Sequence, residues 1–352
     1  MGLIHDLGAG ALRHLPPETA HTLSLSLMEA GLGPRVRPPA GLETTLAGLA
    51  LPNPLGLAAG YDKNAAAPDA LLAMGLGFVE VGTITPLPQA GNAKPRLFRL
   101  KADGAVINRM GFNNEGLEAA LRRLRARAGR PGVVGVNVGA NKDSADRAGD
   151  YVAGLTAAWP HAAYITANIS SPNTPGLRGL QEGGALEELL GRLSAARAQA
   201  TATHGAKPLF LKIAPDLDEE AIAGIVEACV RHRLTGLIVS NTTVARPPGL
   251  TARHRAEPGG LSGAPLFGLS TKALRTAAQA ARGRLVLIGA GGVASGAAAL
   301  AKLKAGASAV QLYSALALQG PGLVPRVLKE LKAALAAEGF ASVGAAVGAE
   351  LR

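Results

Sequence analysis

Residues 284–314 read RLVLIGAGGVASGAAALAKLKAGASAVQLYS, and this stretch holds one complete unit of the predicted fold. The apolar run at 285–289 does not alternate with polar residues, which is typical of a parallel strand buried on both faces. A glycine-rich turn follows, then an alanine-rich segment with helical spacing at 296–304 and a second apolar run at 309–312. This order predicts a strand, a crossover helix and a second parallel strand of the same sheet.

The same order of strand, polar turn and helix recurs along the chain from residue 50 onward. The expected strands lie at 55–59, 78–82, 133–138, 164–169, 209–213, 237–240, 285–289 and 309–312. Helices are expected at 116–128, 186–200, 219–232 and 296–304. Eight strand–helix units in series predict an α/β fold, a (β/α)8 TIM barrel. A doubly wound parallel sheet is the alternative, although it usually needs fewer units.

Residues 1–40 do not fit this repeat and predict a helical hairpin ahead of a barrel that occupies 41–352. Pro16 and Pro17 divide the segment into two helices. The apolar faces of the two helices are formed by Leu3, Leu7, Ala11 and Leu15, and by Leu23, Leu27 and Ala30. Such a hairpin is either a lid packed on the barrel or an element that contacts a membrane.

The composition argues against several classes of protein. With 48% hydrophobic and 17% charged residues among 352, the chain is typical of globular proteins. Cys229 is the single cysteine, so no intramolecular disulfide can form and a reducing compartment is expected. No apolar run reaches the ~18 residues of a membrane span, and no secretory signal is recognisable. The seven histidines lack metal-ligand spacing, so no metal is expected.

The formal charge of +11 suits nucleic acid, an anionic membrane surface or a small acidic substrate. Aromatic residues make up only 3% of the chain, which is few for stacking on single-stranded bases. The arginine-rich run at 122–130 is interpreted as the exposed face of a helix. We therefore expect no nucleic-acid partner, and a monomer, since no exposed apolar stripe stands out.

Gly289, Gly291 and Ala294 match the dinucleotide-binding fingerprint that follows a strand. That fingerprint also needs an acidic residue about 20 positions later to bind a ribose, and none occurs between Gly292 and Lys329. The dinucleotide interpretation therefore fails. A glycine turn whose backbone amides face a phosphate remains, because phosphate-bearing cofactors commonly bind a barrel after its last two strands.

Polar residues follow every expected strand, at the barrel end where such enzymes carry their active sites. They are Lys63, Thr83, Asn137, Asn168 to Asn173, Lys212, Ser240 to Thr242, Gly291 and Gly292, and Tyr313 and Ser314. Each of them alone is consistent with an ordinary turn or helix cap. Together they predict an active site at this end.

Lys63 and Lys212 stand at the ends of buried strands, where an ammonium group is costly without an anion. The anion is a substrate carboxylate, a phosphate or a reduced cofactor, or else the lysines form salt bridges with the nearby Asp62 and Asp216. Ser171 has no G-x-S-x-G context and no histidine near it in sequence, which disfavours a serine hydrolase.

Asparagines gather at 108–114 and recur at Asn168, Asn173 and Asn241. An asparagine side chain both donates and accepts hydrogen bonds. Several together suit a planar ring that carries amide groups.

These stretches resemble the dihydroorotate dehydrogenase family, flavin enzymes of pyrimidine synthesis. The matching segments, in the order of the family, are NPLGLAAGYDKN, VEVGTITP, GNAKPRLFRL, INRMGFNNEG, GVNVGANK, NISSPNTPGLR, LKIAPDL, SNTTVARP, GGLSGAPL, IGAGGVASG and AGASAVQLYS. The serine of SSPN, where the soluble class has a cysteine, is similar to the membrane-associated class that uses quinone. The N-terminal hairpin is similar to that class as well.

The resemblance implies a set of residues for each ligand. FMN is expected to contact Ala59, Gly60, Thr83, Asn137, Asn168, Lys212, Ser240, Gly263, Gly292, Tyr313 and Ser314. Dihydroorotate is expected to contact Lys63, Asn108, Arg109, Met110, Gly111, Phe112, Asn168, Asn173, Asn241 and Thr242. The quinone head is expected to contact His21, Arg99 and Tyr313.

The resemblance also implies the reaction and its location. Ser171 is expected to be the base that takes the C5 proton, helped by a water relay or by Thr174, while hydride goes to FMN. Lys212 is expected to stabilise the negative charge of the reduced flavin. A membrane quinone is the expected final acceptor, with peripheral contact through residues 1–40 on the cytoplasmic side of the cell membrane.

Three other functions are less consistent with these residues. A flavoprotein barrel acting on RNA, such as a dihydrouridine synthase, fits the high charge but not the absence of a cysteine in the 168–176 loop. A soluble dihydroorotate dehydrogenase linked to fumarate or NAD conflicts with the serine base and the hairpin. A barrel that only binds a phosphate ligand leaves Lys63 and Lys212 unexplained.

Overall fold

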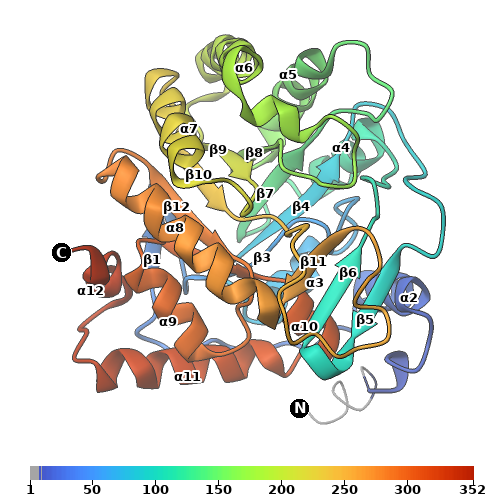
Figure 1. The fold of residues 1–352 in the computed structure, drawn as a ribbon, viewed down its shortest axis with the longest axis vertical. Helices are drawn as coiled ribbons and strands as arrows, with labels where there is room; N and C mark the ends of the chain where they lie inside the picture. Colours follow the sequence, from blue (N-terminus) through green and yellow to red (C-terminus); the bar gives the residue numbers. More distant parts are fainter. Residues whose placement is uncertain (1–7, 9) are drawn as a thin grey trace.

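The computed structural model describes Gly8 and residues 10–352, and its centre is a closed barrel of eight parallel strands. In barrel order the strands are β10 (Gly236–Val239), β12 (Val286–Ala290), β13 (Ala309–Leu312), β3 (Leu55–Leu57), β4 (Phe78–Ile84), β7 (Val133–Val138), β8 (Tyr164–Asn168) and β9 (Leu209–Ile213). The predicted TIM barrel is therefore confirmed, and each of the eight expected strands overlaps an observed one. Figure 1 shows the helices ranged around this barrel.

The helices that follow residue 60 cover the outside of the barrel or close its end. They are α3 (Pro68–Ala73), α4 (Leu117–Ala126), α5 (Arg147–Ala158), α6 (Gly183–His204), α7 (Glu219–Arg231), α8 (Phe267–Ala281), α9 (Gly296–Lys304), α10 (Ser314–Gln319), α11 (Leu323–Ala337) and α12 (Val343–Ala346). The four predicted helices match α4, α6, α7 and α9. Helices α3, α5, α8, α10, α11 and α12 lie outside the predicted ranges. In α5, two glycines weaken the helical propensity.

The barrel interior is filled by aromatic rings that face glycines on neighbouring strands. Phe78, Tyr164 and Phe210 are fully buried in one cluster. A Cβ atom on Gly135 of β7 would lie 2.1 Å from the Tyr164 ring, and one on Gly56 of β3 would lie 2.4 Å from the Phe78 ring. The glycines of these strands therefore provide the space that the rings occupy.

A β-hairpin closes the amino-terminal end of the barrel. It consists of β1 (Thr44–Leu46) and β2 (Leu49–Leu51), which pair antiparallel. Leu46 and Leu51 are buried against the same aromatic cluster. Water is therefore excluded from this end, and the carboxyl ends of the strands form the open mouth.

A second sheet, which was not predicted, stands beside the mouth. Its antiparallel strands are β5 (Leu97–Leu100), β6 (Ala105–Asn108) and β11 (Gly260–Gly263). Helix α2 (Pro17–Glu29) lies next to β5 and β6 in Figure 1, and it begins at the predicted proline break. Leu3 and Leu7 of the expected first helix lie outside the described residues. Within the described part of the chain, no helix is long and apolar enough to cross a bilayer.

The glycines that face rings inside the barrel are predicted to be essential for stability. Gly135→Ala should lower the free energy of unfolding by about 1–3 kcal/mol, because its methyl group would overlap the Tyr164 ring. The matched control is Gly224→Ala on the exposed side of α7, where a Cβ meets no atom within 4 Å. Gly224→Ala should raise the free energy of unfolding by up to about 1 kcal/mol. Urea unfolding of the three proteins measures both effects, and a Gly135→Ala protein of wild-type stability would contradict the packing argument.

Candidate active site

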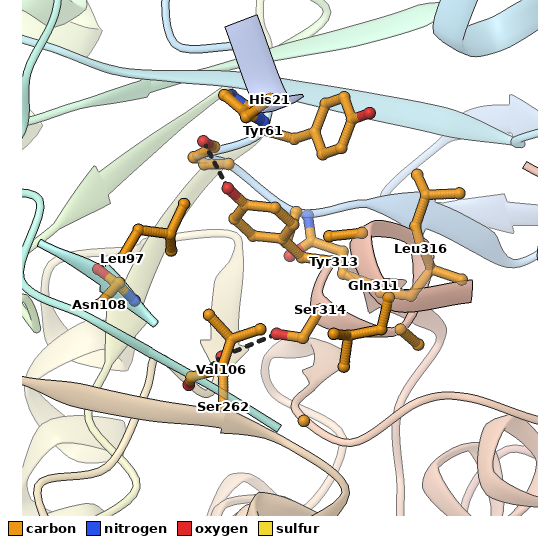
Figure 2. A pocket seen from close by; sticks show the side chains of 18 of the residues that line it. His21, Tyr61, Leu97, Val106, Asn108, Ser262, Gln311, Tyr313, Ser314 and Leu316 are labelled. Carbon is orange, nitrogen blue, oxygen red and sulfur yellow. Dashed lines mark hydrogen bonds between the residues drawn. The ribbon is translucent and has the colours of Figure 1, made fainter. Parts of the chain in front are cut away.

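One cavity of about 450 Å³ lies between the barrel mouth, the β5–β6–β11 sheet and α2. Nearly all the residues predicted from sequence line it, among them Ser171, the two lysines and the asparagines. They are His21, Ala59, Gly60, Lys63, Thr83, Arg99, Asn108, Met110, Gly111, Phe112, Asn168, Ser171, Asn173, Lys212, Ser240, Asn241, Thr242, Gly263, Gly292, Tyr313 and Ser314. The predicted residues that do not line it are Asn137, Arg109 and the predicted proton acceptor Thr174. Figure 2 shows part of this wall, with Asn108, Ser314 and Tyr313 around the same space.

Below the cavity floor lies a buried carboxylate, that of Glu80 on β4. It accepts hydrogen bonds from Asn137 Nδ2 at 2.7 Å, Tyr164 OH at 3.0 Å, Thr166 Oγ1 at 3.2 Å and Gln311 Nε2 at 3.0 Å. Glu80 and Gln311 were not identified from sequence. An acidic residue inside the apolar run VEV, and an amide inside AVQL, were the signals that could have revealed them.

The Glu80 network fixes two residues of the cavity wall. Asn137 accepts a 2.6 Å hydrogen bond from Thr83 Oγ1, and Asn168 Nδ2 donates to the same Thr83 oxygen at 3.0 Å. Asn137 thus acts on the site from just below its wall. Thr83 and Asn168 are held in single orientations through it.

Two polar side-chain groups of the floor have no partner among the described residues. Gln311 Oε1 is buried without a hydrogen bond. Lys212 is 5% exposed, and its ammonium group forms no hydrogen bond or ion pair with the described residues. Burial lowers the pKa of Lys212, and the charge of Glu80 opposes that shift. An acceptor and a cation are therefore available to a ligand.

The loop after β8 brings Ser171 into the cavity with the predicted amides around it. Ser171 Oγ accepts a 3.2 Å hydrogen bond from the backbone of Asn173, whose Nδ2 donates to Asn108 Oδ1 at 3.3 Å. Asn241 Nδ2 donates to Ser170 Oγ at 3.0 Å. Thr174 Oγ1 is buried near this loop without a partner. No histidine bonds to Ser171 in the described structure, so a serine-hydrolase triad is not formed there.

Neither Lys63 nor Lys212 forms the aspartate salt bridge that was the alternative prediction. Asp62 instead accepts hydrogen bonds from the backbone of Asn64, Ala66 and Ala67, and so shapes the loop. Asp216 pairs with Arg178 at 2.8 Å. Desolvation lowers the pKa of Lys63 to about 8, although Glu18 and Asp62 partly oppose it.

The side chain of Arg109 points away from the cavity. Its guanidinium pairs with Glu257 at 2.8 Å and lies 4.7 Å from the centre of the Phe98 ring. Only the backbone of Arg109 is near the site, where its carbonyl accepts a 3.1 Å hydrogen bond from Asn92 Nδ2. The predicted contact of this residue with a ligand is thereby restricted to main-chain groups.

The α2 end of the cavity is aromatic. His21 and Tyr313 lie on either side of Tyr61 (Figure 2) and pack edge-on against its ring. The centre of the Tyr61 ring is 5.0 Å from that of His21 and 5.6 Å from that of Tyr313. Tyr61 OH lies 3.3 Å from Ser24 Oγ. Burial, together with the positive charge of Lys63, lowers the pKa of His21 to about 3, so its ring is neutral near pH 7. Tyr61 was not among the residues predicted for the site.

Arg99, predicted for the quinone pocket, also has a structural role. Its Nη1 donates at 3.0 Å to the backbone carbonyls of Arg13 and Leu15. It therefore holds the segment that leads into α2. The described residues contain no group of three histidine, cysteine or acidic side chains that could bind a metal ion.

A chain of hydrogen bonds connects α2 with the Ser171 loop. Glu18 of α2 pairs at 2.6 Å with Arg96, which is 6% exposed and also donates to the carbonyl of Asn92 at 2.7 Å. Asn92 Nδ2 in turn donates to the carbonyl of Asn173 at 3.0 Å. Burial raises the pKa of Glu18, but the hydrogen bond and charge of Arg96 outweigh it and the net pKa is lowered.

Comparison with known proteins relates this arrangement to one family. A family model described as dihydroorotate dehydrogenase matches residues 41–335. The chain is 54% identical to a dihydroorotate dehydrogenase (quinone) of Parvibaculum lavamentivorans, over 96% of each chain. It is 55% identical to the protein of the same name from Allorhizobium ampelinum, over 93% of this chain and 91% of the other.

Solved structures of dihydroorotate dehydrogenases are also similar to this chain. The structure of DHODH from Eimeria tenella in complex with ferulenol has a TM-score of 0.90 and 39% identity, covering 95% of this chain and 96% of that one. The ligand-free DHODH of the same organism also has a TM-score of 0.90 and 39% identity, covering 96% of this chain and 99% of that one.

The Glu18–Arg96 pair is predicted to hold α2 on the barrel. Glu18→Gln should accelerate amide hydrogen exchange in residues 17–29 by about tenfold, because a charge-assisted hydrogen bond is lost while the barrel is untouched. Glu29→Gln on the same helix is the control, since Glu29 is exposed and should leave exchange unchanged. Mass spectrometry of peptides measures the exchange rates in both variants. Equal exchange in the two variants would mean that apolar contacts alone hold α2.

Proposed function

The chain belongs to the dihydroorotate dehydrogenase family, and we propose that it oxidises (S)-dihydroorotate to orotate, using FMN and a membrane quinone, in pyrimidine (UMP) biosynthesis. One observation carries the proposal: a single cavity joins the Ser171 loop at the barrel mouth to His21 of α2. Such a cavity gives substrate and quinone access to one cofactor from two sides. The alternative of a fumarate- or NAD-linked enzyme has no use for the α2 end.

The residues of the barrel mouth fit FMN. When bound, FMN accepts a hydride from the substrate and passes the electrons on to the quinone. The unpartnered Gln311 Oε1 and the unpaired Lys212 suit the polar edge of a flavin ring. Gly291 and Gly292 adopt φ of +102° and +75°, which frees the backbone amides of their turn for a phosphate. The other proposed contacts are Ala59, Gly60, Thr83, Asn168, Ser240, Gly263, Tyr313 and Ser314, while Asn137 would act through its hydrogen bond with Thr83.

The substrate requires a cation and a set of amides. Lys63 supplies the cation for its carboxylate, and being withdrawn from water it attracts an anion strongly. Asn108, Asn173 and Asn241 converge on the same space and offer both donors and acceptors to the ring. Thr242 and the 109–112 segment complete the proposed set, with Arg109 contributing main-chain groups only.

Removal of the proton from C5 of the substrate is assigned to Ser171. A serine hydroxyl is a weak base, so the proton must be passed onward. Thr174 supports this step, because it lies three residues after Ser171 in the same loop and its buried hydroxyl has no hydrogen bond among the described residues. Both residues are buried, so the proton would be held away from bulk water.

The α2 end is proposed to take the quinone head and to rest on the cytoplasmic face of the cell membrane. Leu15, Leu23, Leu27 and Leu32 are all more than a third exposed on or beside α2. Such a cluster of exposed leucines suits a lipid surface. His21 is neutral and Tyr313 lies beside Tyr61, so the pocket can accept an uncharged quinone ring. Residues 1–40 would form this element, and the protein would act as a monomer without nucleic acid.

Anaerobic mixing with dihydroorotate tests the proposed function. The purified protein should be yellow, and dihydroorotate should bleach the flavin band. Ubiquinone should restore the band, whereas fumarate and NAD⁺ should not. Restoration by fumarate or NAD⁺ would keep the family and remove the quinone assignment. The matched variant Ser171→Ala should keep FMN but slow bleaching by at least about a hundredfold, and near-normal bleaching would remove Ser171 from the mechanism.

Binding of the substrate carboxylate is predicted to weaken at alkaline pH. Lys63 attracts an anion only when protonated, and its pKa in the free protein is about 8. A bound anion raises that pKa, so the Kd for orotate should be constant below pH 8 and rise by up to about tenfold per pH unit above it. Flavin absorbance changes between pH 6 and 9 measure this Kd. Lys63→Met should bind weakly at every pH, and a pH-independent wild-type Kd would contradict the assignment.

A further inference from the structure

Lys302 of α9 is a fully buried lysine that the proposed reaction does not use. Its Nζ donates to Ser270 Oγ at 2.9 Å and to Thr271 Oγ1 at 3.1 Å, and lies 5.3 Å from the centre of the Phe267 ring. In the described part of the chain no carboxylate comes within ion-pair distance of it. A buried cation that is solvated only by hydroxyls and a ring is unstable unless a negative charge lies near.

Lys302 packs against the amino-terminal end of α8, and this position makes the imbalance larger. Phe267, Ser270 and Thr271 all belong to the first turns of that helix. The dipole of a helix is positive at its amino-terminal end and disfavours a cation there. Both hydroxyls donate their own protons to backbone carbonyls, Thr271 to Phe267 O at 2.7 Å and Ser270 to Gly291 O at 3.1 Å. They can therefore only accept from Lys302, and the cluster needs an anion.

The same cluster supports the glycine turn after β12. Ser270 Oγ joins the Lys302 ammonium to the carbonyl of Gly291 through two hydrogen bonds. A Cβ atom on Gly291 would lie 2.8 Å from Ser270 Oγ, and one on Gly292 would lie 2.9 Å from the backbone nitrogen of Phe267. A Cβ on Gly289 would lie 3.1 Å from Cδ of Lys302. All three glycines of the motif thus pack on Lys302 or on the α8 residues around it.

We propose that Lys302 is a positioning residue for the phosphate of FMN, a buried positive charge behind the Gly291–Gly292 turn that makes the site select a phosphate dianion over an uncharged hydroxyl. The proposal rests on the proposed use of FMN. Lys302 does not reach the cavity wall, and it acts through Ser270 and through space. Burial lowers the pKa of Lys302 to about 7, so a neighbouring dianion would also keep it protonated.

Competition between FMN and riboflavin tests this role, because the two flavins differ only in the phosphate. Holoenzyme is equilibrated by dialysis with equal concentrations of both, and the bound flavins are separated and measured. The bound ratio does not depend on the fraction of protein that is folded. Lys302→Met keeps the length and apolar packing of the side chain and removes the charge. It should lower the FMN-to-riboflavin ratio at least about tenfold relative to wild type.

Two further variants make the result specific. Lys304→Met removes a lysine of the same helix that is paired with Glu338 on the surface, and it should leave the ratio unchanged. Thr271→Val removes one acceptor of the Lys302 ammonium with little change of shape, and should lower the ratio by a smaller factor. Thr271 does not line the cavity, so it decides the question if Lys302→Met does not fold.

The outcomes separate this inference from the function on which it rests. A wild-type protein that binds neither flavin would overturn the proposed function. A wild-type preference for FMN that persists in Lys302→Met, even with weaker binding of both flavins, would overturn only the inference and leave Lys302 a structural residue. Loss of preference in Lys302→Met but not in Lys304→Met supports it.

Discussion

The buried carboxylate of Glu80 is the feature on which the rest of the site depends. A carboxylate inside a barrel is stable only when its oxygens accept enough hydrogen bonds, and this one accepts four, from side chains of β7, β8 and β13. Each amide that donates to it is thereby fixed in one orientation. Gln311 must then turn its Oε1 away from Glu80, and Asn137 must turn its Oδ1 toward Thr83. The arrangement of donors and acceptors at the cavity floor is therefore determined by a residue that touches no ligand.

The second constraint is a set of three lysines that have no acidic partner among the described residues. Lys63, Lys212 and Lys302 are all withdrawn from water, and none has a carboxylate within ion-pair distance among the described residues. Burial lowers the pKa of each. Protonation of each lysine is costly without an anion beside it and favoured when an anion binds there. The charge of each lysine is therefore coupled to the binding of that anion. The proposed anions are a substrate carboxylate, the flavin ring edge and a phosphate.

The barrel could be predicted from sequence because its signals are local. A buried strand such as β9 is apolar except for Lys212, which stands one residue before its carboxyl end. Polar residues at or just after that end necessarily lie at the mouth. The β5–β6–β11 sheet could not be predicted, since Leu261 pairs with Ile107 from a distant part of the chain and both runs are short. The direction of Arg109 was equally hidden, because Glu257 of a remote loop determines it. Glu80 was overlooked because a single acidic residue in an apolar run does not show whether its side chain faces the inside or the outside of the barrel.

The path from Glu18 to Asn173 implies that the two ends of the cavity are not independent. Arg96 has little exposed surface, and its guanidinium is shared between a carboxylate on α2 and the carbonyl of Asn92. Asn92 holds the carbonyls of Arg109 and Asn173, which belong to the two loops around the proposed substrate. If α2 moves away, Arg96 loses its anion and becomes a poorly paired buried cation, which destabilises the loop conformation that it supports. The position of α2, the helix proposed to bind the quinone, is thus energetically coupled to the loop that carries Ser171, without any contact between the two proposed ligands.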